Sequence, residues 1–165
     1  MDHRGLPACL LFAVLILTIA ACARQDTFEK SRRLQVPEPL SAQVDPRLLT
    51  LQESSSLWDS SNTYNVGRAL GYVVKPTPNA TLRLSYVASH LEVDCRTIMG
   101  IALYDPDLCQ AAYYLSVQVE QNGFPQVVDA SARARSGATP GRAARDAIEL
   151  AVLDFHRKGS VMLAR

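Results

Sequence analysis

The chain has 165 residues, of which 20% are charged, and a formal net charge of +1. This length suits one domain with a single hydrophobic core. Lys and Arg are interleaved with Asp and Glu along the chain, whereas nucleic-acid binding normally needs a basic face that displaces phosphate counterions. We therefore expect no nucleic acid among the partners of this protein.

Residues 1–21 have the plan of an export signal. A short start with His3 and Arg4 precedes an apolar run from Leu6 to Ala21. The run is shorter than the roughly 20 residues that a helix needs to cross the hydrocarbon core, and it ends in small residues that suit a signal peptidase. A retained transmembrane anchor is the alternative interpretation of this segment.

The apolar run ends in Ile19-Ala20-Ala21-Cys22. These residues resemble the lipobox of bacterial lipoproteins, in which an aliphatic residue and two small residues precede a cysteine; Ile19 stands where Leu is more common. The resemblance implies that residues 1–21 are a lipoprotein signal peptide and that Cys22 carries a diacylglyceryl thioether and an N-acyl chain such as palmitate. An ordinary secretory signal cleaved nearby is the other alternative.

Acylation of Cys22 would place the protein on a membrane. Each buried CH₂ group contributes about 0.8 kcal/mol, so two or three acyl chains hold a protein on a bilayer almost irreversibly. Ala23 follows the cysteine, in place of the Asp that resembles an inner-membrane retention signal. The resemblance therefore implies the outer membrane, facing the periplasm, if the host has two membranes.

Two further divisions of the chain follow from composition. Residues 22–46 are charged and contain Pro37, Pro39 and Pro46 without a sustained apolar period, which predicts a flexible lipid-anchored tether, because proline disfavours helix and extends the chain. Residues 47–165 are predicted to form a single α+β domain. A second short helix within residues 62–74 stays open, since its apolar spacing is helical but Gly67 and Gly71 oppose helix.

Three segments read as antiparallel strands. Residues 81–94 are rich in β-branched and aromatic residues, and their apolar parity changes near Ala88, which predicts a bend or bulge there. Residues 112–121 and 124–135 alternate apolar and polar side chains on either side of Asn122-Gly123. This dipeptide favours a type I′ turn, and hence a hairpin with one buried face.

The last predicted element is an amphipathic helix. Thr139 is a suitable N-cap, Pro140 suits the first helical position, and Gly159 suits the C-terminal cap. The predicted fold class is therefore α+β, with a curved antiparallel β-sheet and one C-terminal amphipathic helix packed on one face. The apolar stripe of the helix consists of Ala144, Ala147, Ile148, Ala151, Val152 and Phe155.

Cys95 and Cys109 are the cysteines left for the folded domain. Because export delivers the chain to an oxidising compartment, we predict a disulfide between them, worth roughly 3 kcal/mol through closure of a short loop. Two unpaired buried thiols are the alternative. We expect no metal site, because CxxC and HExxH are absent and the histidines stand alone.

The common catalytic and nucleotide-binding motifs GxSxG, GxxxxGK[ST] and GxGxxG are absent, so we expect no enzyme and no cofactor. A thiol nucleophile at Cys95 or Cys109 with His90 or His156 as base is a weaker alternative. Tyr113 and Tyr114 are interpreted as sheet packing and rim residues, although an exposed aromatic pair would indicate a sugar-binding platform.

The order of elements resembles the small α+β sandwiches of periplasmic lipoproteins, including the lipopolysaccharide-assembly lipoprotein and YajG-like families. The likeness is one of architecture and carries over no functional residue. We therefore expect a non-enzymatic accessory or assembly component of the cell envelope, whose sheet edge or loops dock a protein partner. The alternative is an envelope module that binds a small lipid or glycan in an apolar pocket.

Overall fold

The computed structural model describes residues 34, 36–54, 63–97, 104–136 and 140–163. Apart from residue 34, all of these belong to one compact unit, residues 36–165. The predicted signal peptide, Cys22 and most of the predicted tether lie outside the described residues.

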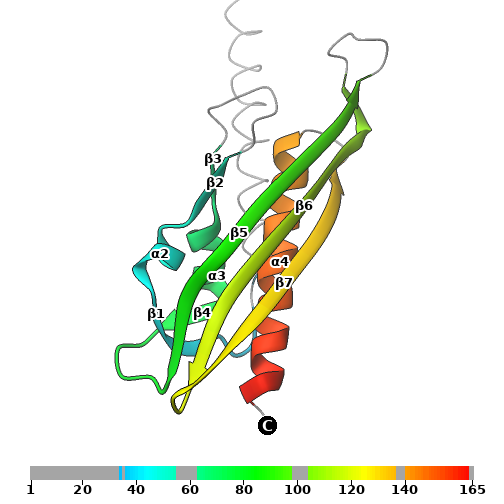
Figure 1. Ribbon diagram of the computed structural model, residues 1–165. Helices are drawn as coiled ribbons and strands as arrows, with labels where there is room; N and C mark the ends of the chain where they lie inside the picture. The colour runs from blue at the N-terminus through cyan, green and yellow to red at the C-terminus, as the bar shows by residue number, and fades with distance from the viewer. Residues whose placement is uncertain (1–33, 35, 55–62, 98–103, 137–139, 164–165) are drawn as a thin grey trace, which may run out of the picture. The chain divides into compact units, whose positions relative to one another are not determined.

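A five-stranded sheet in the order β4-β1-β5-β6-β7 forms the framework of this unit. Its main part is three long antiparallel strands, β5 (Leu82–Thr97), β6 (Tyr104–Gln121) and β7 (Phe124–Ser136). Figure 1 shows these three strands side by side, with the C-terminal helix behind them. The predicted α+β class, with long antiparallel strands and a C-terminal helix on one face, is confirmed, although the complete sheet also contains parallel pairs.

Two short strands extend the sheet beyond β5. Strand β1 (Leu40–Val44) runs parallel to both β5 and β4 (Val74–Pro76). The tether was predicted to reach residue 46, so the sheet begins earlier than expected. The physical reason is that Leu40 and Ala42 are buried, although the prolines around β1 hide its apolar alternation.

A second, two-stranded sheet and two short helices lie between β1 and β4 in the chain. Strands β2 (Gln52–Ser54) and β3 (Thr63–Asn65) are antiparallel. Helix α2 (Pro46–Leu49) is capped by Asp45, and α3 (Val66–Val73) is capped by Asn65, whose side chain accepts a hydrogen bond from the amide of Arg68 at 2.8 Å. The second short helix that the sequence left open is therefore present.

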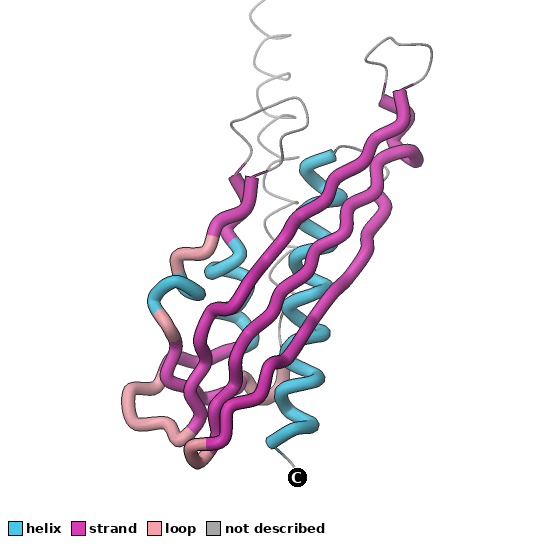
Figure 2. Tube along the Cα trace, in the orientation of Figure 1, coloured by secondary structure: helices cyan, strands magenta, loops and turns pink. Residues whose placement is uncertain are grey.

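Helix α4 (Pro140–Leu163) covers one face of the sheet and packs mainly on β6 and β7 (Figure 2). Every residue of the predicted apolar stripe is buried. The predicted end of the helix at Gly159 is wrong, because the helix continues to Leu163. A Cβ at residue 159 would lie 3.1 Å from Cδ1 of Leu40, so this glycine serves close packing against β1 rather than a cap.

Both predicted irregularities of the long strands are present. The register between β5 and β6 shifts between Tyr86 and Ala88, as expected of a β-bulge. Asn122 and Gly123 have φ of 54° and 84°, as a type I′ turn requires. Two faces follow, an inner face covered by α4 and an outer face on the opposite side.

Candidate functional site

The outer face of the sheet is the candidate functional surface. We define it as the alternate residues Arg83–Ser85 and Ala88–Asp94 of β5, Gln110–Glu120 of β6 and Pro125–Arg135 of β7, which point away from α4. No described helix covers this face, which is turned toward the viewer in Figure 1. Antiparallel sheets often have one buried face and one solvent-exposed face, so exposure of this face does not by itself indicate a function.

At one end of the outer face the charges are sorted by strand, whereas Arg83 on β5 and Asp129 on β7 lie nearer the other end. Glu92 and Asp94 lie on β5, and Arg133 and Arg135 lie on β7. The register places Glu92 and Arg133 on either side of Ala112, and Asp94 and Arg135 on either side of Gln110. All four charged residues are exposed. This half of the face therefore has an acidic margin, an uncharged middle strand and a basic margin.

Tyr114 occupies the centre of the outer face. The register aligns it with His90 on β5 and Ser131 on β7, and 38% of its surface is exposed. Nε2 of His90 lies 3.4 Å from Oε1 of Glu92. Aromatic residues and arginines dominate the binding energy of protein interfaces, so the composition of this face suits a protein partner.

On the inner face, Tyr113 belongs to a polar cluster of four residues. Ser89 donates a hydrogen bond to Glu53 on β2, and the hydroxyls of Ser89 and Tyr86 lie 3.1 Å apart. The Tyr113 side chain is fully buried, and its hydroxyl has no hydrogen-bond partner of normal geometry among the described residues. Burial raises the pKa of Tyr113, and the negative charge of nearby Glu53 raises it further. This cluster joins the small sheet to the large one.

The free edges of the sheet are less accessible than its face. At the β7 edge, Nζ of Lys158 donates to the carbonyl of Asp129 at 2.7 Å, and the amide of Ser131 donates to Oδ2 of Asp154 at 3.4 Å. Side chains of α4 thus occupy the backbone groups in the middle of this edge. The other edge, β4, is short and contains Pro76, which has no N–H. If a partner strand docks at an edge of this sheet, as expected from the sequence, the ends of β7 are the places that α4 leaves available.

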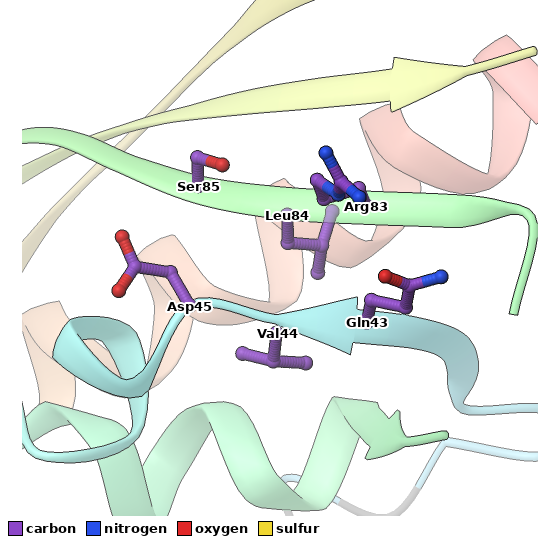
Figure 3. A pocket seen from close by; sticks show the side chains of 6 residues that line it. All are labelled: Gln43, Val44, Asp45, Arg83, Leu84 and Ser85. Carbon is purple, nitrogen blue, oxygen red and sulfur yellow. The ribbon is translucent and has the colours of Figure 1, made fainter. Parts of the chain in front are cut away.

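A hollow with a volume of about 180 Å³ lies between β1 and β5 (Figure 3). Two of its polar side chains, Gln43 and Asp45, already have partners. Gln43 donates to the carbonyl of Ala80 at 2.8 Å, and hydrogen bonds from the backbone and side chain of Arg47 hold the pKa of Asp45 below its ordinary value. The volume is below the ~300–1,000 Å³ of typical ligand pockets, so this hollow does not support a lipid or glycan site.

The structure joins Cys95 and Cys109 by a disulfide. The two cysteines are directly opposite in the β5–β6 register, with their Cα atoms 4.1 Å apart. Since both sulfurs are bonded, neither is a thiol nucleophile in this structure. His156 lies apart from them, with Nε2 2.9 Å from the carbonyl oxygen of Glu38.

Two further observations concern only the described residues. None of their helices combines the length and the hydropathy needed to cross a bilayer. Their His, Cys, Asp and Glu side chains form no group of three or more that could hold a metal ion. The absence of metal, cofactor and enzymatic activity stays a prediction.

The sequence indicated the polarity of the outer face but not its sorted charges. The Asn122-Gly123 turn fixes the β6–β7 register, so the position of Arg133 opposite Ala112 could have been derived. The position of Glu92 opposite Ala112 could not have been derived from the sequence. The β5–β6 register depends on a bulge and on a connection that lies outside the described residues.

No known protein family and no curated protein sequence matches this chain. Among solved structures, the chain is similar to a "putative lipoprotein" from Caulobacter crescentus CB15, with 17% sequence identity, a TM-score of 0.33, and coverage of 82% of this chain and 93% of that one. A TM-score of this size does not establish a common fold.

Proposed function

We propose that this protein is a lipid-anchored, non-enzymatic accessory component of the cell envelope, which docks a protein partner through the outer face of its sheet. The anchor would be Cys22 on the periplasmic side of the outer membrane. The single observation that carries the docking role is the outer face itself, which presents an exposed aromatic residue between acidic and basic margins.

Three properties support the face over other surfaces as the docking site. No described helix covers it (Figure 1), its long β5–β6 hairpin is fixed by the disulfide between Cys95 and Cys109, and its backbone groups are already paired within the sheet. A rigid surface loses little conformational entropy on binding. The proposed function thus needs no catalytic group and no ligand cavity.

The anchor is tested by mass spectrometry of the mature N-terminus purified from native membranes. We expect the chain to begin at Cys22 and to carry acyl chains, and we expect Cys22→Ser to release the domain from the membrane fraction. An N-terminus elsewhere, or undiminished membrane association of the variant, would contradict the anchor.

The docking role is tested by placing a photo-crosslinking amino acid at Tyr114 in intact cells. The matched control places it at Leu150, which is 44% exposed on α4, the helix on the other side of the sheet. We expect protein adducts from position 114 and few from position 150. Equal yields at both positions would remove the support for the outer face.

A further inference from the structure

We infer that the partner that fits the outer face is a second copy of this chain, packed face to face in a symmetric dimer. The inference rests on the proposed use of this face for docking. It starts from the sorted charges of Glu92 and Asp94 on β5 and of Arg133 and Arg135 on β7.

The symmetry of such a dimer is set by these charges. When a twofold axis runs along β6, β5 of one copy lies over β7 of the other, and each residue stays at its own height along the strands. Glu92 then faces Arg133 of the second copy, twice in each dimer. A twofold axis across the strands through the middle of the face would instead put β5 over β5 and β7 over β7 with their ends exchanged. Glu92 and Arg133 would then face the uncharged Ser85 and Val127, and Asp94 with Arg83 would be the one kind of opposite-charge pair on the margins. The first arrangement offers two kinds, Glu92 with Arg133 and Asp94 with Arg135, and is the more complementary.

In the half of the face that carries the sorted charges, the middle strand β6 is uncharged, so a twofold axis along β6 brings no like charges together there. Residues on β6 meet their own copies there, and Gln110, Ala112 and Tyr114 carry no charge that would repel itself. At the far end of the face, Glu120 meets its own copy, but the register gives it Arg83 as a neighbour on β5. Stacked sheets lie about 10 Å apart and cross at about 30°. The crossing keeps Glu92 and Arg133 within reach, because they lie one row from Tyr114.

The same axis suits two anchored chains. Strand β1 runs parallel to β5, and Gln43 pairs with Arg83 near the start of β5, so Leu40 enters the sheet at the end where the β6–β7 turn lies. An axis along the strands keeps both entry points at one end of the dimer, where both chains can come from one membrane. An axis across the strands would put the two entry points at opposite ends.

The expected affinity follows from the size of the face. With a strand rise of about 3.3 Å and a strand spacing of about 4.8 Å, the face measures roughly 40 by 14 Å, so a dimer buries on the order of 1,100 Å² in total. This is near the lower limit for specific interfaces. Two copies held on one bilayer meet at a high effective concentration, so the dimer belongs to the membrane-bound protein.

The first test is cross-linking of Tyr114→Cys in the full-length protein in its native membrane, with a short bis-maleimide. Because Tyr114 lies beside the axis, we expect a dimer of two identical chains. The control Leu150→Cys is exposed on α4 and should give at least tenfold less dimer. Absence of the Tyr114→Cys dimer in folded protein, with the Cys95–Cys109 disulfide intact, would overturn the inference.

The second test reverses charges in the Tyr114→Cys background. Glu92→Arg and Arg133→Glu each create two repulsive pairs per dimer, so each should lower the yield of dimer about tenfold. The double variant Glu92→Arg/Arg133→Glu restores both pairs and should recover the yield to within about threefold. Differently tagged single variants, expressed together, should form the mixed dimer. Loss without recovery in the double variant, or no loss in either single variant, would overturn the inference.

The failures of the two proposals are distinguishable. Adducts at position 114 that contain only a different protein would overturn self-association but keep the docking role. Release of wild-type protein from the membrane would remove the anchor, and Tyr114→Cys cross-linking of the purified chain at high concentration would then still report on the face. Near-ultraviolet circular dichroism of each variant separates a lost interface from a lost fold.

Discussion

Tyr113 and Tyr114 are neighbours in the chain, yet the sheet gives them opposite surroundings. Tyr113 is 0% exposed beneath the small sheet and α4, whereas Tyr114 is 38% exposed at the centre of the outer face. Strand geometry alone turns successive side chains to opposite faces. The comparison shows that one strand, β6, serves the stability of the domain with one parity and its proposed docking role with the other.

The two faces differ in what specifies them. The inner face is fixed by shape, since alanines of α4 and β7 let the helix lie close to the sheet. The outer face is distinguished by its charges. Glu92 and Arg133 are exposed and are not packed under another element. Substitutions should therefore affect stability on the inner face and association on the outer face.

The largest expected effect is on the inner side of α4. Phe155 is fully buried, so Phe155→Ala should lower the free energy of unfolding by about 3–5 kcal/mol through lost burial and a cavity. The matched control Leu150→Ala removes an exposed side chain of the same helix and should change it by less than about 1 kcal/mol. Urea unfolding measures both. Similar losses in the two variants would show that α4 does not present one face to the sheet.

A pair of glycines extends the comparison to α3. A Cβ at Gly67 would clash with the backbone carbonyl of Leu49, whereas a Cβ at Gly71 would have nothing within 4 Å. Gly67→Ala should therefore destabilise the domain by about 1–3 kcal/mol, because the α2–α3 contact must open.

Gly71→Ala is the control in this pair and should stabilise the domain by about 0.5–1 kcal/mol, since alanine favours helix over glycine. Thermal unfolding of both variants gives the sign of each change. Stabilisation by both substitutions would contradict the close approach of α3 to α2.

Local signals in the sequence predicted much of this architecture. The Asn122-Gly123 turn, the bend near Ala88, the start of α4 at Pro140 and its buried stripe are all present. Each depends on residues close together in the chain, which is why a single sequence is sufficient to find them.

Features that depend on distant contacts were missed. Strand β1 exists because β4 and β5 pair with it from both sides, and Gly159 lies inside α4 because Leu40 packs against it. The acidic margin of the outer face needed the β5–β6 register, and the proposed anchor at Cys22 stays a prediction from its motif.

A smaller effect concerns the hydroxyls of the inner polar cluster. Because the buried hydroxyl of Tyr113 has no hydrogen-bond partner of normal geometry among the described residues, Tyr113→Phe should leave the free energy of unfolding unchanged or raise it by about 1 kcal/mol. Tyr86→Phe loses the contact with Ser89 and should lower it by about 0.5–1.5 kcal/mol. Chemical denaturation of both variants makes the comparison, and a loss for Tyr113→Phe larger than for Tyr86→Phe would assign that hydroxyl a partner.

The smallest expected effect is at the β7 edge, between the two faces. Partial burial acts to raise the pKa of Asp154, but hydrogen bonds from Lys158, Arg157 and the amide of Ser131 outweigh it, so the pKa lies below 3.8. A carboxyl whose pKa is lowered by folding adds stability above its unfolded pKa, and this stability is lost as the pH falls through the folded pKa. Asp154→Asn should therefore cost less than about 1 kcal/mol at neutral pH and nothing below the folded pKa.

Melting curves of Asp154→Asn and wild type between pH 2.5 and 7 measure how the two stabilities converge as the pH falls. A further variant, Asp154→Ala, removes the oxygen that accepts from the amide of Ser131 at the open edge of β7, which Asn could still do through its amide oxygen. If edge pairing rather than the outer face drove association, Asp154→Ala would raise the yield of cross-linked dimer. If the face drives it, the yield stays at the wild-type value, so this variant separates edge from face.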